Sequence, residues 1–210
     1  MLTNLLIGLP GHRPGGLALS LLLGAGSAAV AMIAGLGYAT ICVALPKISL
    51  PLQGLMAFIR GIPLLILVFM AGTGTPLPLV VAAFLALCLY SLCHVGEIIR
   101  GFLGAYPQLL RDQARLTGIS APTEWLILRV PWALRRSLEA LGTHWISLYK
   151  DTGALAVLAI GELTTIVQLL SQTVSTERWL GILATAAALY LVASLAIATA
   201  LKLLTRKVSI

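Results

Sequence analysis

The chain has little charge. Only 10% of its 210 residues are Asp, Glu, Lys or Arg, and seven of them are acidic, whereas soluble domains carry roughly 25% charged residues. Hydrophobic residues make up 59% of the sequence, and the mean hydropathy is +1.01. The scarcity of charge excludes an ordinary soluble protein and predicts a single integral membrane domain over residues 1–210.

Several chemical signatures are also missing. The three cysteines, Cys42, Cys88 and Cys93, lie in apolar runs and have neither metal-ligand nor redox spacing. The sequence contains no H-E-x-x-H zinc motif, no paired-Asp or Ser/Lys site and no Walker A loop. We therefore expect no metal site and no ATP hydrolysis in this chain. The net charge of +7 lacks interleaved aromatic residues, so we expect no nucleic-acid binding.

Long apolar runs predict five membrane-spanning helices, because a helix needs about 20 apolar residues to cross a hydrocarbon core of ~30 Å. Residues Pro14–Pro46 contain no charged side chain. Residues Gly61–Gly96 are also uncharged but too long for one helix, and turn residues at Gly72–Pro78 divide them. We expect another turn at Pro46–Pro51. The predicted spans cover residues 17–43, 60–76, 79–102, 152–171 and 179–202.

The basic residues predict the orientation. With five spans, Arg13 and Arg178 fall on one side of the membrane, and the other twelve Lys and Arg residues fall on the opposite side. Cytoplasmic loops carry the excess of basic residues. We therefore expect the N-terminus outside and the C-terminus in the cytoplasm. No internal repeat is visible, so an inverted-repeat carrier is not predicted.

A polar segment, Ala105–Thr152, interrupts the apolar sequence and holds six of the fourteen basic residues and four of the seven acids. Pro107 suits the first turn of a short helix, and Gly118 suits its left-handed end. Ala114 and Gly118 are four residues apart and share one helix face, which favours the close approach of another backbone or an aromatic ring. On pattern alone, a loop that only fixes topology explains this segment as well as a docking element does.

A second helix is expected in the same segment. Pro131 should bend or interrupt it, because proline lacks the N–H that an inner helical turn needs. The basic side chains of Arg129, Arg135 and Arg136 are expected to face water, lipid headgroups or a partner.

The polar segment resembles the EAA loop of binding-protein-dependent ABC importer permeases, and especially that of the polar amino acid permeases of the histidine/glutamine type. In that family a Pro is followed eleven residues later by a Gly, with a Glu-Ala-Ala triplet between them. Pro107 and Gly118 keep this spacing, and Asp112, Gln113 and Ala114 stand at the triplet positions.

Further pieces occur in the family's order. Phe58–Phe69, FIRGIPLLILVF, resembles FRGTPLLVQLFF; Gly96–Gly101, GEIIRG, resembles AEIVRG; and Gly161–Thr164, GELT, resembles AELT. Residues 127–152, ILRVPWALRRSLEALGTHWISLYKDT, resemble VILPQALRRALPPLGNEFISLLKDTS, with Trp132 in place of Gln. The pieces cover residues 58–164, and beyond them only the hydropathy agrees.

The resemblance implies an all-α, integral membrane fold: the type I ABC importer (MetI-like) permease core of five transmembrane helices, with a cytoplasmic coupling loop at about 105–145. It implies a transport subunit that performs no covalent chemistry and moves a polar amino acid by alternating access across the bacterial cytoplasmic membrane. It also implies partners: an ABC ATPase dimer that binds the ATP and Mg²⁺, an external solute-binding protein, and a second permease, identical or paralogous. The ATPase-coupling residues would then be Asp112, Gln113, Ala114, Gly118 and Pro131.

Polar side chains inside the spans are candidates for the substrate pathway, because an intramembrane charge costs about 2.5 to 3.5 kcal/mol on insertion scales. Glu162, predicted near the middle of the fourth span, either contacts the substrate's ammonium group or forms an inter-helix hydrogen bond. Tyr90, His94 and Glu97 recur at helical spacing and should form one polar stripe. His94 stands where the family commonly has Tyr, and a packed, hydrogen-bonded histidine is the simpler interpretation. Thr164 is the fifth pathway candidate.

Six further residues are assigned to structural or gating roles: Arg60, Gly61, Pro63, Arg100, Lys150 and Asp151. Arg60 precedes the second span and should anchor it at the cytoplasmic surface or join a gate. Glu97 and Arg100 are spaced to pair on one helix. Asp151 or Thr152 should cap the N-terminus of the fourth span.

Two other classes of function stay open. One is an ATP-independent carrier or channel. The other is an intramembrane enzyme that uses His94, Glu97 and Glu162 as a metal or acid/base site.

Overall fold

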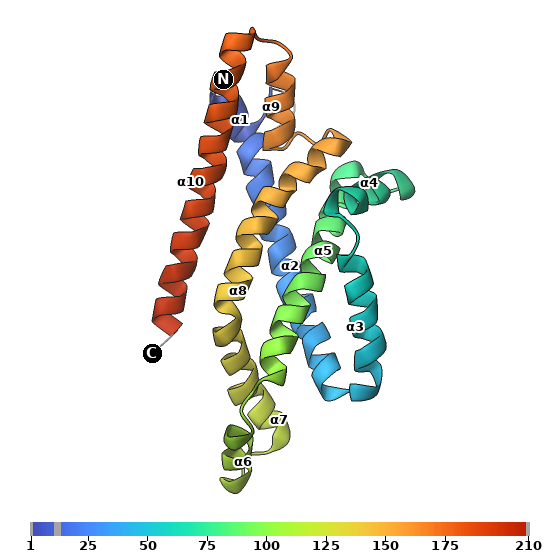
Figure 1. Ribbon diagram of the computed structural model, residues 1–210, viewed down its shortest axis with the longest axis vertical. Coiled ribbons are helices and arrows are strands. Elements are labelled where there is room, and N and C mark those ends of the chain that lie inside the picture. The colour runs from blue at the N-terminus through green and yellow to red at the C-terminus, as the bar shows by residue number, and fades with distance from the viewer. Residues whose placement is uncertain (1, 11–13, 209–210) are drawn as a thin grey trace.

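Two long apolar helices, α2 (Gly16–Ala44) and α5 (Leu79–Gly104), form the centre of the protein. They lie side by side in the computed structural model, which describes residues 2–10 and 14–208 (Figure 1). Small residues allow this contact. A Cβ atom at Gly35 would lie 2.9 Å from the Val95 side chain, and one at Gly96 would lie 2.6 Å from the Tyr38 ring. Glycine is therefore required at both positions by the closeness of the two helices.

Helices α3 (Pro46–Arg60) and α4 (Leu64–Gly74) follow α2 and are bent by 92° at the break between them. The expected turn at Pro46–Pro51 is wrong, because these residues begin α3. Pro46 occupies its first turn, where the fixed φ of proline suits a helix and the missing N–H costs nothing. Gly61 ends α3, and Pro63 precedes α4. If the bent pair forms one span, that span begins at Pro46 rather than at residue 60.

The first half of the polar segment lies at one end of the bundle and is called the foot. It is made of α6 (Gln108–Leu116), α7 (Ala121–Thr123) and the π-helix η1 (Glu124–Arg129). The next helix, α8 (Val130–Asp151), runs back along α5 (Figure 1). The expected loop at 105–145 therefore differs from the structure after residue 129. Ala133, Ser137 and Leu141 are buried at helical spacing, whereas Arg135 and Arg136 are exposed. The charges that suggested a loop lie on the outer side of a packed helix.

The predicted fourth span, 152–171, is not one helix. Residues Thr152–Leu158 form the 3-10 helix η2, and Ala159 has a positive φ of 52°. Helix α9 (Leu163–Ser171) has only nine residues and rises about 14 Å, too little to cross a core of ~30 Å. The left-handed Ala159 turns the chain before α9 begins.

Helix α10 (Thr176–Val208) contains the predicted fifth span and packs on α8. The short α1 (Leu2–Ile7) lies with α9 at the end of the bundle far from the foot, and α10 descends toward the foot (Figure 1). Among the described residues, three helical segments are long and apolar enough to cross a membrane: Gly16–Ala44, Leu79–Gly104 and Arg178–Leu203. Counting the bent pair α3–α4 gives four. The described residues contain no β-strand, so the all-α class is confirmed, whereas the count of five spans is not.

Candidate functional site

Helix α6 is an amphipathic helix displayed on the foot. Ala114 is its buried residue, whereas Asp112 and Gln113 are exposed. Two apolar side chains are also exposed: Leu109 by 67% and Leu116 by 87%. Leu109 and Leu116 are seven residues, or two turns, apart and so lie on the same side of this short helix. Asp112 itself accepts a hydrogen bond from Gln108 at 3.0 Å.

Gly118 ends α6 as predicted, with a positive φ of 77°. The Gly118 N–H donates to the Arg115 carbonyl at 3.0 Å, and the Ile119 N–H donates to the Ala114 carbonyl at 2.9 Å. These two bonds make the Schellman ending of a helix. A Cβ atom on Gly118 would meet nothing within 4 Å. Glycine is thus needed here for its backbone conformation, and the space beside it is open.

A hollow of about 850 Å³ lies between α6 and α8. Three of the predicted coupling residues, Gln113, Ala114 and Pro131, line it, together with Trp132. Asp112 and Gly118 are not among its lining residues. Four of the five predicted coupling residues therefore lie on α6 or directly after it, whereas Pro131 lies in α8, and only Gln113, Ala114 and Pro131 face one common space.

At the expected bend or interruption near Pro131 the helix does not break but changes type, from π-helix to α-helix. Helical backbone runs without a gap from Ala121 to Asp151, and Pro131 sits in the first turn of α8. The six residues before α8 form the π-helix η1. A π-helix is rare and occurs mostly as a short interruption of an α-helix, frequently at functional sites.

Arg129, which was expected to face water, lipid or a partner, is instead 7% exposed. Its Nε and Nη2 atoms donate to the Leu103 carbonyl at 3.0 and 2.7 Å. Its Cζ atom lies 4.7 Å from the centre of the Trp125 ring and 5.8 Å from that of the Tyr106 ring. Burial lowers the pKa of this guanidinium, but arginine stays charged at neutral pH. Sequence analysis missed this role, although apolar neighbours and an aromatic residue one turn away were a signal for it.

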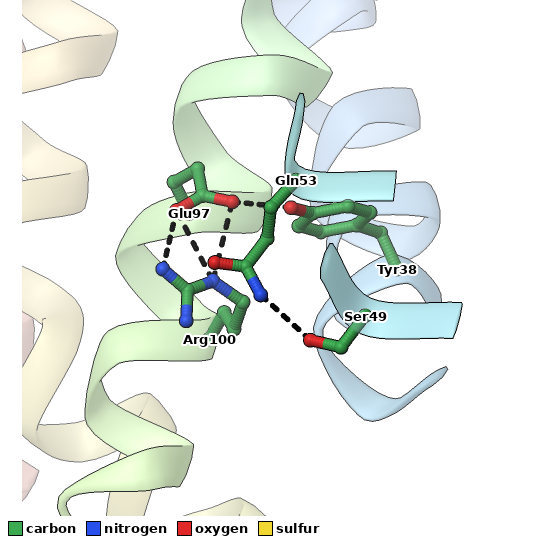
Figure 2. Close-up of polar contacts among 5 residues, drawn as sticks. All are labelled: Tyr38, Ser49, Gln53, Glu97 and Arg100. Atoms are coloured by element: carbon green, nitrogen blue, oxygen red, sulfur yellow. Dashed lines mark hydrogen bonds and ion pairs between the residues drawn. The ribbon is translucent and has the colours of Figure 1, made fainter. Parts of the chain in front are cut away.

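A second polar cluster joins α2, α3 and α5. Figure 2 shows the Glu97 carboxylate held by Arg100, whose Nη2 atom lies 2.7 Å from it, and by the Tyr38 hydroxyl, which donates from α2. Gln53 and Ser49 of α3 lie beside this group, with their side chains 2.6 Å apart. The predicted pairing of Glu97 with Arg100 is confirmed. Arg60 is exposed at the end of α3, at the bend before α4.

The predicted stripe of Tyr90, His94 and Glu97 is divided between two clusters, because Glu97 turns toward Tyr38. His94 Nδ1 lies 2.9 Å from the Tyr90 carbonyl, and the His94 ring stacks on the His144 ring with centroids 5.0 Å apart. His144 comes from α8 and was missed from the sequence. Its Nε2 atom lies 2.9 Å from the Ser91 hydroxyl. His94 is therefore a packed, hydrogen-bonded histidine in the seam between α5 and α8.

Glu162 lies elsewhere than expected, because it precedes α9 rather than occupying the middle of a span. It is fully buried, and its carboxylate accepts from the Thr164 and Thr165 N–H groups at 2.9 and 2.8 Å. The hydroxyls of Ser20 and Tyr190 lie 3.4 and 3.5 Å from it. Burial raises the pKa of Glu162, although the backbone hydrogen bonds oppose this shift. Glu162 thus caps a helix where α2, α9 and α10 meet.

Three other candidates, Thr164, Lys150 and Asp151, lie within about 12 residues of Glu162 in the sequence. The Thr164 hydroxyl lies 2.8 Å from the Tyr190 hydroxyl, so Thr164 and Glu162 are brought together. Lys150 and Asp151 end α8, and Asp151 makes no capping hydrogen bond to η2. The Thr152 hydroxyl bonds to the Tyr149 carbonyl. The expected cap of a fourth span is therefore wrong, because the helix that starts at Thr152 is the short η2 and neither side chain caps it.

The chain is similar in sequence to permease proteins of glutamine ABC transporters. No protein-family model matches the chain. It is 32% identical over 123 residues to the probable glutamine ABC transporter permease protein GlnP of Bacillus subtilis, over 56% of each chain. It is 30% identical over 116 residues to the glutamine transport system permease protein GlnP of Escherichia coli, over 50% of this chain and 52% of the relative. The chain thus spans about half the length of these two relatives.

Solved structures share the fold over nearly the whole chain. An amino acid ABC transporter crystallised with histidines has a TM-score of 0.79 at 25% identity, covering 90% of this chain and 91% of that one. The MetNI methionine ABC transporter in an inward-facing conformation also has a TM-score of 0.79, at 19% identity, which shows the fold alone. The chain therefore has the type I ABC importer permease fold and is a homologue of amino acid ABC transporter permeases.

Proposed function

We propose that the chain is the transmembrane permease subunit of an ATP-driven importer that moves a polar amino acid across the bacterial cytoplasmic membrane by alternating access. A solute-binding protein outside the membrane delivers the substrate, and a separate ATPase dimer binds ATP and Mg²⁺ and drives the cycle. Two permease chains, identical or paralogous, form one pathway. The observation that carries this proposal is α6: a short amphipathic helix with exposed leucines at the tip of a helical bundle whose homologues are amino acid permeases.

In this proposal α6 is the helix that docks on the ATPase. The exposed side chains of Leu109 and Leu116 provide apolar contacts to the ATPase. The exposed side chains of Asp112 and Gln113 provide polar contacts to it. The left-handed Gly118 ends the helix so that its open side can meet the partner. Pro131 sits where the foot joins α8. Movement of the ATPase would therefore reach the bundle through the foot.

We propose that α8 supplies the span that the sequence assigned to residues 152–171. With α2, the bent pair α3–α4, α5 and α10, it completes five spans. The foot then faces the cytoplasm, the N-terminus lies outside and the C-terminus lies in the cytoplasm. The basic residues of the foot, Arg111, Arg115 and Arg129, and those near the C-terminus support this orientation, whereas Lys150 at the far end of α8 falls on the outer side.

The substrate pathway is proposed to include Glu162 and Thr164, with Tyr90, His94 and Glu97 as further members. Glu162 would contact the substrate's ammonium group in exchange for one of its hydroxyl partners. The Tyr149 hydroxyl is buried without a hydrogen-bond partner, and the Tyr149 ring lies 5.5 Å from that of Tyr190, which reaches Glu162. A buried polar group left unpaired is costly, so this hydroxyl suits a ligand that enters the cluster.

Copurification tests the proposal. The tagged chain, extracted from native membranes in mild detergent, should bring down a soluble ATPase with a Walker A sequence and a second permease chain, both identified by mass spectrometry. Recovery of the chain alone, still able to mediate solute flux after reconstitution, would instead support an ATP-independent carrier or channel. Chemical conversion of a substrate by the purified chain would support an intramembrane enzyme.

A further inference from the structure

One buried side chain connects the foot to the end of α5. Leu103 is the residue before the last in α5, and its carbonyl is among the four at a helix end that have no partner within the helix. The residue four positions later is Pro107, which has no N–H to offer. Arg129, 26 residues further along the chain, fills this acceptor with two donors.

The position of Arg129 is fixed from several sides. Trp125, one turn earlier on η1, lies against its guanidinium, and Tyr106 approaches it from the linker after α5. Tyr106 in turn packs edge-on against Trp132 at the start of α8, with ring centroids 5.4 Å apart. A cation at the C-terminal end of a helix also interacts favourably with the helix dipole. Arg129, the last residue of η1 before α8, thus contacts Leu103 of α5, Tyr106 of the linker and Trp125 of η1.

Two charged side chains lie near Arg129, but neither forms an ion pair with it. Arg111 of α6 and Glu124 of η1 act on it electrostatically, with opposite signs. The Arg111 Nε and the Glu124 Oε1 atoms are themselves buried without a hydrogen-bond partner. Neither of the two ion pairs found among the described residues involves Arg129. The hydrogen bonds to the Leu103 carbonyl are therefore the specific polar attachment of this cation.

The other connections between α6 and the bundle leave room for α6 to move. The hollow of about 850 Å³ separates α6 from α8, and the backbone joins α5 to α6 through only Ala105, Tyr106 and Pro107. A movement of α6 could be absorbed by that hollow and that linker. A rigid connection to α5 needs a further contact.

We infer that Arg129 is a positioning residue that makes the foot and α5 move as one body, so that displacement of α6 is passed to α5. This inference rests on the proposed coupling role of α6. Arg129 contacts neither substrate nor ATP and acts through the Leu103 carbonyl. Its two-pronged donor geometry is specific to arginine, because a lysine carries the charge on a single nitrogen.

Three variants test this role in the transporter reconstituted with its copurified ATPase. Arg129→Met removes the charge and both donors, Arg129→Lys keeps only the charge, and Arg135→Met is the control because Arg135 is exposed on α8. Loss of hydrogen bonds to a buried charge should lower substrate uptake per ATP hydrolysed by roughly tenfold or more in Arg129→Met. ATPase binding should stay within about twofold of the unaltered chain, and Arg129→Lys should show the same defect more weakly. Unchanged uptake per ATP in Arg129→Met would overturn the inference.

If Arg129→Met does not accumulate in the membrane, Arg129→Lys decides, and normal uptake per ATP in that variant overturns the inference. A distance measurement keeps this inference separate from the proposed function. Spin labels at Leu116→Cys on α6 and Leu85→Cys on α5 can be placed selectively, because Cys42, Cys88 and Cys93 are buried. The distance distribution should broaden in Arg129→Met and not in Arg135→Met. An equally narrow distribution in Arg129→Met would contradict the inference. If the distribution broadens but no ATPase couples to the chain, the Arg129 contact is supported and only the proposed function is contradicted.

Discussion

Tyr38 on α2 donates its hydroxyl hydrogen to the carboxylate of Glu97 on α5, and its ring covers Gly96. Arg100 holds the same carboxylate through two nitrogens, Nε and Nη2 (Figure 2). The two central helices are therefore joined here both by close packing and by a hydrogen bond to a charged group. Glu97, a candidate for substrate contact, already has its partners within the chain.

Removal of this hydroxyl should loosen the two central helices. In Tyr38→Phe the ring still covers Gly96, but the partly buried carboxylate of Glu97 loses a donor, which costs about 1–3 kcal/mol. Thermal unfolding of the purified chain in detergent should show a lower Tm than the unaltered chain. Tyr90→Phe is the matched control, since it removes a hydroxyl from the seam between α5 and α8. Equal Tm values for Tyr38→Phe and Tyr90→Phe would show that the Tyr38–Glu97 contact contributes nothing specific.

Substitution of Gly118 should impair transport without preventing membrane insertion. A residue with a Cβ atom in the left-handed conformation costs roughly 1–2 kcal/mol, and a bulky side chain would also fill the open space beside α6. Gly118→Trp should abolish uptake while the amount of chain in the membrane stays normal. Gly118→Asn should retain most activity, because Asn tolerates a positive φ. Normal ATPase copurification and uptake by Gly118→Trp would refute the docking role of α6.

Glu162 should make stability depend on pH. Its pKa is raised in the folded chain, so the folded state binds more protons than the unfolded state above the ordinary Glu value of about 4.3. Stability from this group is full below that value and is lost as pH rises through the folded pKa. The Tm of the unaltered chain should therefore fall relative to that of Glu162→Gln as pH increases in this window. A parallel pH dependence of the two proteins would mean that Glu162 does not titrate as its burial requires.

The topology can be tested with an impermeant thiol reagent on intact cells. Arg115→Cys on α6 should react only after the membrane is opened, because the foot faces the cytoplasm. Gln172→Cys, which follows α9, should react from outside. The native cysteines are buried and should stay silent in both variants. Labelling of both sites from the same side would exclude α8 as a span, since α8 is the long helix between them.

Features that depend only on residues close together in the chain could be predicted from the sequence. Gly118 at the end of α6 and the pairing of Glu97 with Arg100 each depend on near neighbours in the chain. Helix α8 was harder, because its charges suggested a loop until the packing of Ala133 and Leu141 on the bundle was visible. Arg129 and Glu162 depend on partners more than 20 residues away in Leu103 and Ser20. Such partners are set by the tertiary fold, which hydropathy and helical spacing do not encode.

The central claim is that this chain carries an amino acid only when a separate ATPase drives it. The direct measurement is uptake of labelled amino acids into proteoliposomes that contain the chain and its copurified ATPase, with the solute-binding protein added outside. Uptake should require internal ATP, stop with vanadate and disappear when either partner is omitted. Uptake that persists with vanadate and without the ATPase would contradict the account.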